Sequence, residues 1–162
     1  MLIHSEQEML DFGQKYGETH PAPLVLELIG DVGAGKTTFV RGLAQGIGIK
    51  ESVTSPSFTI SKVYQGKDAL LVHYDFYRLA DPGIMEEDLA ESISDPHAIT
   101  IVEWGESIQN ILPKDRKIIE IKYIDETTRE LIEKWNSISI PRRQRLSSNS
   151  TVRLTNGILA AI

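Results

Sequence analysis

The 162-residue sequence contains no cysteine, which excludes disulfides, thiolate metal sites and cysteine nucleophiles. Its four histidines (His4, His20, His73 and His97) are too scattered to predict a three-histidine zinc site. Apolar runs reach only about five or six residues, against the roughly 20 that a membrane-spanning helix needs. The first residues have neither the basic start nor the apolar stretch of a signal peptide. We therefore expect a cytoplasmic protein with no membrane association.

Basic residues are also in deficit, with 17 Lys and Arg against 23 Asp and Glu and a formal charge of −6. Residues 141–162 hold four arginines and no acid, so they carry +4 and residues 1–140 carry −10. Because phosphate contacts need an excess of Lys and Arg, direct nucleic-acid binding by residues 1–140 is disfavoured. We predict one domain over residues 1–140, followed by a basic, mobile C-terminal extension over residues 141–162.

A phosphate-binding motif stands out near the N-terminus. Residues 30–37, Gly-Asp-Val-Gly-Ala-Gly-Lys-Thr, match the Walker A pattern at every fixed position. The glycines let backbone N–H groups turn towards phosphate oxygens, and the helix that follows presents its positive dipole end to the same anion. Lys36 supplies charge for the β- and γ-phosphates, and Thr37 offers a hydroxyl to Mg²⁺. The predicted nucleotide-binding residues are Gly30, Asp31, Val32, Gly33, Ala34, Gly35, Lys36, Thr37 and Thr38.

Hydrophobic periodicity predicts alternating helices and strands around this motif. Strands are expected at 24–29, 58–64, 70–74, 99–103 and 118–123, and helices at 6–17 (ended by Gly17), after the phosphate loop, and at 82–92 with Asp81 as the N-cap. The stretch 129–140 fits strand and helix about equally, and we assign it to an edge strand. The alternation predicts an α/β, P-loop NTPase-like three-layer domain with a mainly parallel central sheet.

Two acidic residues end predicted strands where a metal-assisting carboxylate is normally found. Asp75 ends the strand at 70–74, and Glu103 ends the strand at 99–103. Trp104 follows Glu103 and either packs in the core or shapes the site. Arg78 either assists the transition-state charge or pairs with a local acid. The sequence contains no Asn-Lys-x-Asp guanine motif, which favours ATP over GTP.

Between the phosphate loop and the next strand lies the segment Thr54-Ser-Pro-Ser-Phe58, which holds three hydroxyls. P-loop proteins keep a switch that senses the γ-phosphate in this place. An ordinary Ser-Pro turn is the alternative interpretation. The sequence does not decide which hydroxyl, if any, contacts metal or phosphate.

Taken together, these residues resemble the TsaE family (formerly YjeE), small P-loop ATPases of tRNA threonylcarbamoyladenosine biosynthesis. Beyond residues 30–39 the resemblance runs through Thr54–Phe58, His73-Tyr-Asp-Phe-Tyr-Arg-Leu-Ala-Asp-Pro82 and Val102-Glu-Trp-Gly-Glu106, and covers roughly residues 1–135. Ser57 stands where the family usually has threonine, which keeps the hydroxyl. The extension 141–162 has no counterpart in the family, so a contact with tRNA or a partner and no role at all both stay open.

The resemblance implies a bacterial-type protein that binds Mg-ATP and hydrolyses it slowly alone. It also implies that the chain acts with the TsaD and TsaB proteins. In that complex TsaD would catalyse the transfer, the ATPase would permit multiple turnover, and the chain would contact tRNA only through its partners. Lys36 would hold phosphates, Thr37 and Glu103 would serve Mg²⁺, Asp75 and Trp104 would support hydrolysis, and Arg129 would contact the far end of the nucleotide. A small-molecule P-loop kinase and a nucleotide-dependent binding switch are the alternatives.

Overall fold

A computed structural model describes residues 1–79 and 82–135. Its strands are β1 (Leu2–Ile3), β2 (Leu24–Ile29), β3 (Ser61–Gln65), β4 (Leu70–Asp75), β5 (Ala98–Glu103), β6 (Lys117–Tyr123) and β7 (Arg129–Trp135). Its helices are α1 (Glu6–Thr19), α2 (Lys36–Gly46) and α3 (Glu86–Ser94), with 3₁₀ turns at Pro82–Met85 and Gly105–Ile108. The expected N-cap Asp81, the end of the expected strand 129–140 and the extension 141–162 lie outside the described residues. No helix in the described part is long and apolar enough to cross a membrane.

The seven strands form one sheet in the order β1-β7-β6-β2-β5-β4-β3. The four central strands, β6, β2, β5 and β4, run parallel, which confirms the expected parallel centre. The outer pairings, β1–β7, β6–β7 and β3–β4, are antiparallel. Two of them, β3–β4 and β6–β7, join consecutive strands with short connections, which antiparallel pairing permits. The strand over 129–135 is confirmed, but it is not fully at the edge, because Leu2 and Ile3 of β1 pair with its first residues.

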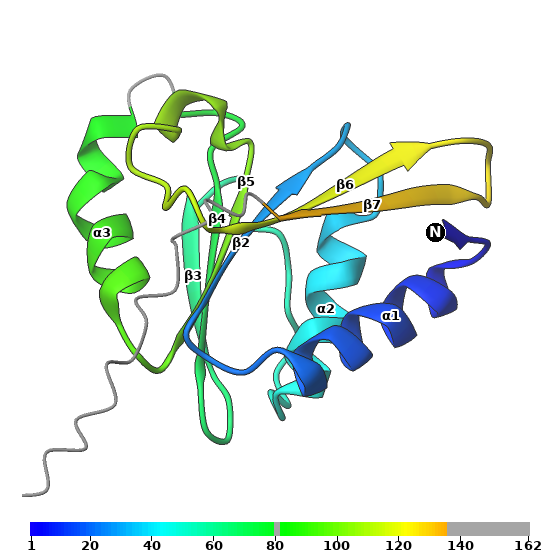
Figure 1. Cartoon of the computed structure of the whole chain (residues 1–162), viewed down its shortest axis with the longest axis horizontal. Helices are drawn as coiled ribbons and strands as arrows, with labels where there is room; N and C mark the ends of the chain where they lie inside the picture. Colours follow the sequence, from blue (N-terminus) through cyan, green and yellow to red (C-terminus); the bar gives the residue numbers. More distant parts are fainter. Residues whose placement is uncertain (80–81, 136–162) are drawn as a thin grey trace, which may run out of the picture.

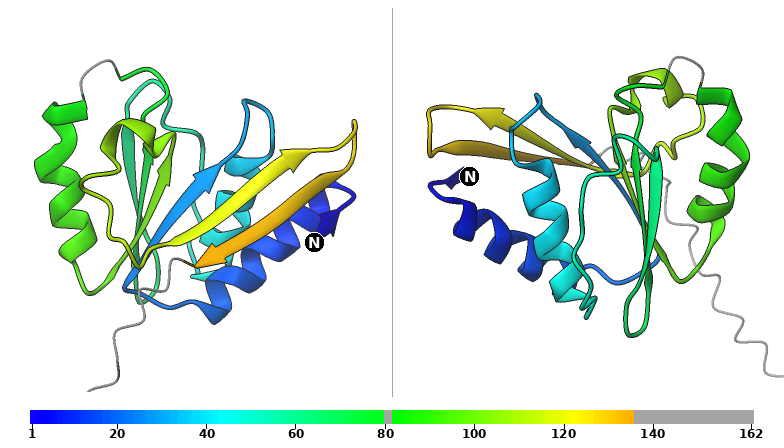
Figure 2. Two further views of the ribbon diagram at one scale, coloured as in Figure 1. Left: turned by 45° about the horizontal axis from the view of Figure 1, so that its top comes forward. Right: turned by 180° about the vertical axis from the view of Figure 1, so that it is seen from behind.

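Helices cover both faces of the sheet, as the expected three layers require. Figures 1 and 2 show α1 and α2 on one side and α3 on the other. Alternating side chains of each strand supply the two cores. Leu71 and Ile101 belong to the core under α1 and α2, whereas Val72 and Val102 belong to the core under α3.

Glycines bring α1 and α2 into close contact, and one of them corrects a predicted boundary. The helix expected to stop at Gly17 continues to Thr19. A Cβ at Gly17 would lie 2.5 Å from the carbonyl oxygen of Leu43, and one at Gly42 would lie 2.1 Å from that of Leu10. Gly17 therefore serves helix packing rather than helix termination. The close approach places the start of α2, and with it the phosphate loop, against α1.

Two other expected elements begin later than predicted. β3 starts at Ser61 rather than residue 58, because the amide groups of Thr59 and Ile60 both bond to the carbonyl of Pro56 and form a turn. The helical segment expected from residue 82 opens as a 3₁₀ turn, and α3 begins only at Glu86. Acidic residues at 86–88 favour that start, because they complement the positive end of the helix dipole.

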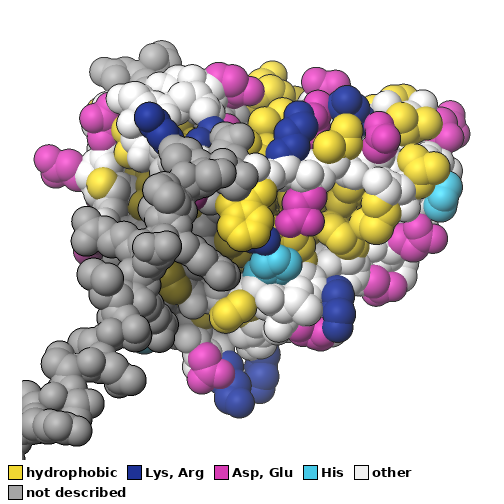
Figure 3. Space-filling view, in the orientation of Figure 1, with side chains coloured by type: hydrophobic (Ala, Val, Ile, Leu, Met, Phe, Trp, Pro, Cys, Tyr) yellow, Lys and Arg dark blue, Asp and Glu magenta, His cyan; other side chains and the backbone are white. Residues whose placement is uncertain are grey.

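Charges on the face drawn in Figure 3 are interspersed. Acidic and basic side chains alternate with apolar ones, and Lys and Arg do not gather into one continuous patch on this face. This distribution agrees with the acidic balance of residues 1–140.

Candidate nucleotide-binding site

The candidate site lies at the edge of the sheet where the parallel strands β2, β4 and β5 end. The phosphate loop follows β2, Asp75 ends β4 and Glu103 ends β5. Asp75 and Glu103 occupy paired positions in the register of these two strands. Ligands of open α/β sheets bind at this carboxyl edge, so the topology brings the predicted residues together where chemistry is expected.

The phosphate loop has the backbone conformation that its glycines permit. Gly35 is the N-cap of α2 and adopts a left-handed conformation with φ 105°. No side chain caps the helix, so its first N–H groups stay available to an anion. Gly33 also has a positive φ, and a Cβ there would meet no atom within 4 Å. Backbone geometry, rather than steric crowding, therefore requires glycine at position 33.

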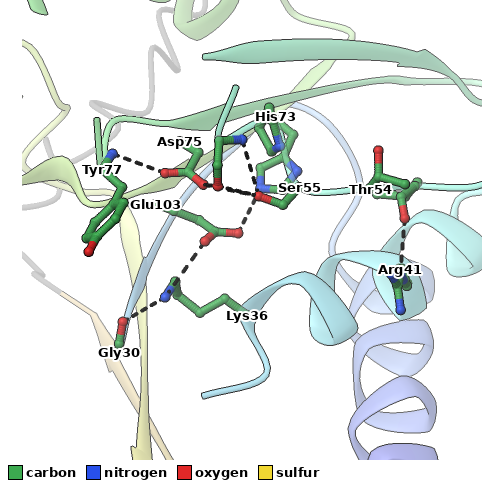
Figure 4. A network of polar contacts seen from close by, with 12 residues as sticks. Gly30, Lys36, Arg41, Thr54, Ser55, His73, Asp75, Tyr77 and Glu103 are labelled. Carbon is green, nitrogen blue, oxygen red and sulfur yellow. Dashed lines mark hydrogen bonds and ion pairs between the residues drawn. The ribbon is translucent and has the colours of Figure 1, made fainter. Parts of the chain in front are cut away.

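Lys36 is buried and turned back into the loop. Its Nζ donates to the carbonyl oxygens of Gly30 at 2.7 Å and Asp31 at 3.1 Å. The same ammonium lies 3.8 Å from the carboxylate of Glu103 (Figure 4). It lies 4.6 Å from the ring centre of Trp104. The Lys36 charge is thus held over the cleft between one carboxylate and one aromatic face.

Asp75 holds the segment that the sequence marks as a possible switch. Its carboxylate accepts hydrogen bonds from the hydroxyls of Ser57 and Ser55, the latter at 3.2 Å, and from the backbone N–H of Tyr77 at 3.1 Å. The hydroxyl of Thr54 instead accepts from Lys62. Of the three candidate hydroxyls, those at 55 and 57 therefore face the site, and Figure 4 shows Ser55 beside Asp75.

Trp104 and Arg78 both reach the cleft from the segments that follow the strands. Trp104 has a left-handed backbone, φ 58°, and its ring packs against Tyr77 as well as over the Lys36 ammonium. The guanidinium of Arg78 stacks on the ring of Phe58, with 4.6 Å to the ring centre. Arg78 is also one of the residues that line the cleft.

A cleft of about 450 Å³ unites these groups. It is lined by most of the predicted site residues, namely Val32, Gly33, Gly35, Lys36, Thr37, Thr38, Asp75, Glu103 and Trp104, together with Ser55, Ser57, Phe58 and Arg78. Gly30 and Asp31 contribute the carbonyls that hold Lys36. Ala34 is buried and lines a second cavity on the other side of the loop.

This second cavity, also about 450 Å³, shares Gly33, Gly35 and Thr38 with the first. Arg129 lines it, and its guanidinium donates to the carbonyls of Asp125 and Thr128 at the β6–β7 turn. Backbone N–H bonds from that turn hold the pKa of Asp125 below its ordinary value. The two cavities are therefore neighbours at the phosphate loop, with Gly33, Gly35 and Thr38 lining both.

Sequence reasoning assigned no role to several residues in or beside the site. His73 contacts Glu103 directly, and Phe58, Tyr77 and Arg41 line the cleft. His73 lies two residues before Asp75 on the same strand, so period-two alternation places both on one face. That spacing was the available signal for His73. Arg41 also donates to the carbonyl of Val53 at 3.1 Å, which ties α2 to the start of the switch (Figure 4).

Comparisons with known proteins agree with this arrangement. Residues 3–131 match the family model described as threonylcarbamoyl adenosine biosynthesis protein TsaE. A tRNA threonylcarbamoyladenosine biosynthesis protein TsaE from Haemophilus influenzae is 39% identical over 141 residues, covering 83% of this chain and 89% of the relative. The TsaE protein of Treponema pallidum is 35% identical, covering 80% and 96%.

A solved structure carries the same fold. The crystal structure of Bacillus subtilis YdiB superposes with a TM-score of 0.71 at 31% sequence identity, and the match covers 85% of this chain and 84% of that one. Sequence and structure therefore agree over nearly all the described residues, and the chain belongs to the TsaE family of tRNA threonylcarbamoyladenosine biosynthesis proteins.

Proposed function

We propose that this chain is a Mg²⁺-dependent ATP-binding and ATP-hydrolysing subunit that supports threonylcarbamoyladenosine modification of tRNA. The observation that carries the proposal is one cleft lined by a phosphate loop, a buried lysine, two strand-end carboxylates and the switch hydroxyls. P-loop domains that hydrolyse nucleotides need these parts together, because their catalysis rests on positioning and charge neutralisation.

The phosphates of the nucleotide would lie over the loop, against the N–H groups at the start of α2 and the ammonium of Lys36. Lys36 would exchange its bonds to the loop carbonyls for bonds to phosphate oxygens. The second cavity would hold the nucleoside, with Arg129 beside it. The missing guanine motif favours adenine as the base.

The donor set suits Mg²⁺ bound together with phosphates. Among the residues that the structure describes, no group of three or more His, Cys, Asp or Glu side chains could hold a metal alone. Mg²⁺ is usually held by one or two carboxylates with substrate phosphates and water, so the Thr37 hydroxyl and the Glu103 carboxylate are appropriate donors. When bound, Mg²⁺ would neutralise the charge that develops on the phosphate oxygens.

The remaining residues would shape the site and exclude water from it. Asp75 would keep Ser55 and Ser57 beside the terminal phosphate through the hydrogen bonds that it already makes. The Trp104 ring covers one side of the Lys36 ammonium and would limit its exposure to water. Arg78 presents a guanidinium to the cleft, where it would stabilise transition-state charge.

The resemblance to the family implies TsaD and TsaB as partners, and the surface supports a partner at the cleft. Three residues that line the cleft, Val32, Phe58 and Tyr77, are exposed apolar side chains, with Phe58 84% exposed. Exposed apolar groups around a site are typical of protein contacts. The acidic balance of residues 1–140 makes indirect contact with tRNA, through the complex, the preferred arrangement.

Hydrolysis of ATP by the purified chain tests the proposal. We expect Mg²⁺-dependent phosphate release that Lys36→Ala abolishes, because it removes the positive charge beneath the phosphates. Lys50→Ala, an exposed lysine beyond the end of α2, is the matched control and should behave as wild type. Equal hydrolysis by wild type and Lys36→Ala would contradict the assignment.

A further inference from the structure

His73 is fully buried in β4, and its two ring nitrogens have different surroundings. Nε2 lies 2.9 Å from Oε1 of Glu103, whereas Nδ1 has no hydrogen-bond partner in the described structure. A carboxylate can only accept, so the contact assigns the proton to Nε2. Nδ1 is then the unpaired ring nitrogen, and Oε1 of Glu103 is occupied as an acceptor.

The sheet fixes this contact from both strands. His73 lies opposite Ile101, so Glu103 is its diagonal neighbour on β5, and Asp75 is the next residue of β4 on the same face. Asp75 is occupied by the switch and the backbone of Tyr77. Glu103 therefore receives a strong side-chain bond on one oxygen from His73, and its other oxygen lies 3.8 Å from Lys36.

We propose that His73 is a positioning residue for Glu103, which fixes the carboxylate so that Oε2 faces Lys36 and the metal site. The inference rests on the proposed function and deepens it. A carboxylate held on one oxygen cannot rotate away from the metal, and groups that orient a metal ligand in this way commonly govern metal affinity. The His73 side chain has no other polar partner among the described residues, which leaves this bond as its chemical role.

Three substitutions separate positioning from simple packing. His73→Gln keeps an N–H donor at about the distance of Nε2, whereas His73→Met has similar length and no donor. His73→Asn keeps a polar side chain that is too short to reach Glu103. It tests the loss of the Glu103 contact in place of His73→Met if the methionine variant does not fold. Thr100→Val is the matched control, because Thr100 is buried in β5 on the face of the sheet opposite His73, and the valine variant loses the hydrogen bonds between the Thr100 hydroxyl and Ser92.

The measurement is the affinity for a fluorescent ATP analogue, taken once with Mg²⁺ and once with EDTA. The Mg²⁺-dependent gain is the ratio of the affinity with Mg²⁺ to the affinity with EDTA. We expect this ratio to be about ten-fold smaller in His73→Met and His73→Asn than in wild type, with the affinity in EDTA unchanged. His73→Gln should retain most of the gain, and Thr100→Val all of it. An unchanged gain in His73→Met, or a glutamine variant no better than methionine, would overturn the inference.

A double-variant comparison tests whether His73 acts through Glu103. In a Glu103→Ala background, His73→Met should cause no further loss of the Mg²⁺-dependent gain. Additive losses would show that His73 acts elsewhere and would overturn the inference. Failure of wild type to bind the analogue overturns the proposed function and this inference with it. Normal Mg²⁺-dependent binding that is indifferent to His73 overturns the inference alone.

Discussion

Asp75 and Glu103 face each other in register at the ends of β4 and β5, yet their carboxylates have separate partners. Asp75 binds the hydroxyls of Ser55 and Ser57, and Glu103 contacts His73 and Lys36. Both carboxylates are buried. One strand end is therefore tied to the segment 54–58, and the neighbouring strand end is tied to Lys36.

The link to the switch predicts a result for Ser57. Ser57→Ala removes a hydroxyl bonded to the Asp75 carboxylate, and hydrogen bonds to charged groups contribute about 1.5–3 kcal/mol. We expect ATP hydrolysis to fall by roughly ten-fold if that energy holds the switch in place. Ser57→Thr keeps the hydroxyl and should stay within about two-fold of wild type. Steady-state phosphate release measures both, and full activity in Ser57→Ala would separate the switch from catalysis.

The position of Glu103 predicts a split between binding and hydrolysis. Glu103→Ala leaves the phosphate loop and Lys36 in place, so nucleotide binding should persist. Mg²⁺-dependent hydrolysis should fall by about a hundred-fold, because one metal donor is gone. Glu106→Ala, an exposed acid in the following turn, is the control. Unchanged hydrolysis in Glu103→Ala would remove the metal assignment.

A buried ion pair away from the cleft predicts a stability effect. Arg116 Nε lies 2.7 Å from Glu27 Oε2, and Gln109 donates to the other oxygen at 2.6 Å. Arg116→Met leaves the buried Glu27 charge without its cation and should lower the free energy of unfolding by about 3–5 kcal/mol. Glu27→Met combined with Arg116→Met should cost much less than the single change. Urea unfolding measures both, and an equal or greater loss in the double variant would contradict this account.

The turn between β6 and β7 predicts a dependence on pH. Backbone bonds from Thr128 and Thr127 lower the pKa of Asp125 below its ordinary value of 3.8. Because the folded-state pKa is the lower one, the stabilisation is present above about pH 4 and is lost as pH falls through the folded-state value. Asp125→Ala should remove this part of the acid dependence of unfolding. It should also weaken nucleotide binding modestly, because the Asp125 carboxylate holds the turn whose backbone carbonyls at Asp125 and Thr128 position Arg129. Identical acid unfolding curves would contradict the prediction.

Much of the site was predictable because its signals are local. The Walker A residues are contiguous, and Asp75 and Glu103 directly follow apolar runs that the sheet turns into parallel strands. Once those strands are parallel, their ends must meet at one edge, so short-range patterns suffice to assemble the cleft.

What could not be predicted depends on long-range packing. Gly17 resembles a helix stop in sequence, but it lies inside α1 because α2 packs against it. The two-residue β1 is too short to have a periodicity, and it exists through pairing with β7. Glu27 and Arg116 are 89 positions apart in the sequence, and no local sequence pattern predicts their contact.

The central claim is that this chain drives repeated rounds of tRNA modification with ATP. The most direct test is multiple-turnover formation of threonylcarbamoyladenosine on tRNA by purified TsaD and TsaB, with the threonylcarbamoyl donor supplied, in the presence and absence of this chain. We predict that product exceeds one equivalent of the partner complex only when the chain and ATP are both present, and not with Lys36→Ala. Product that is unchanged by a chain that still binds ATP would contradict the claim.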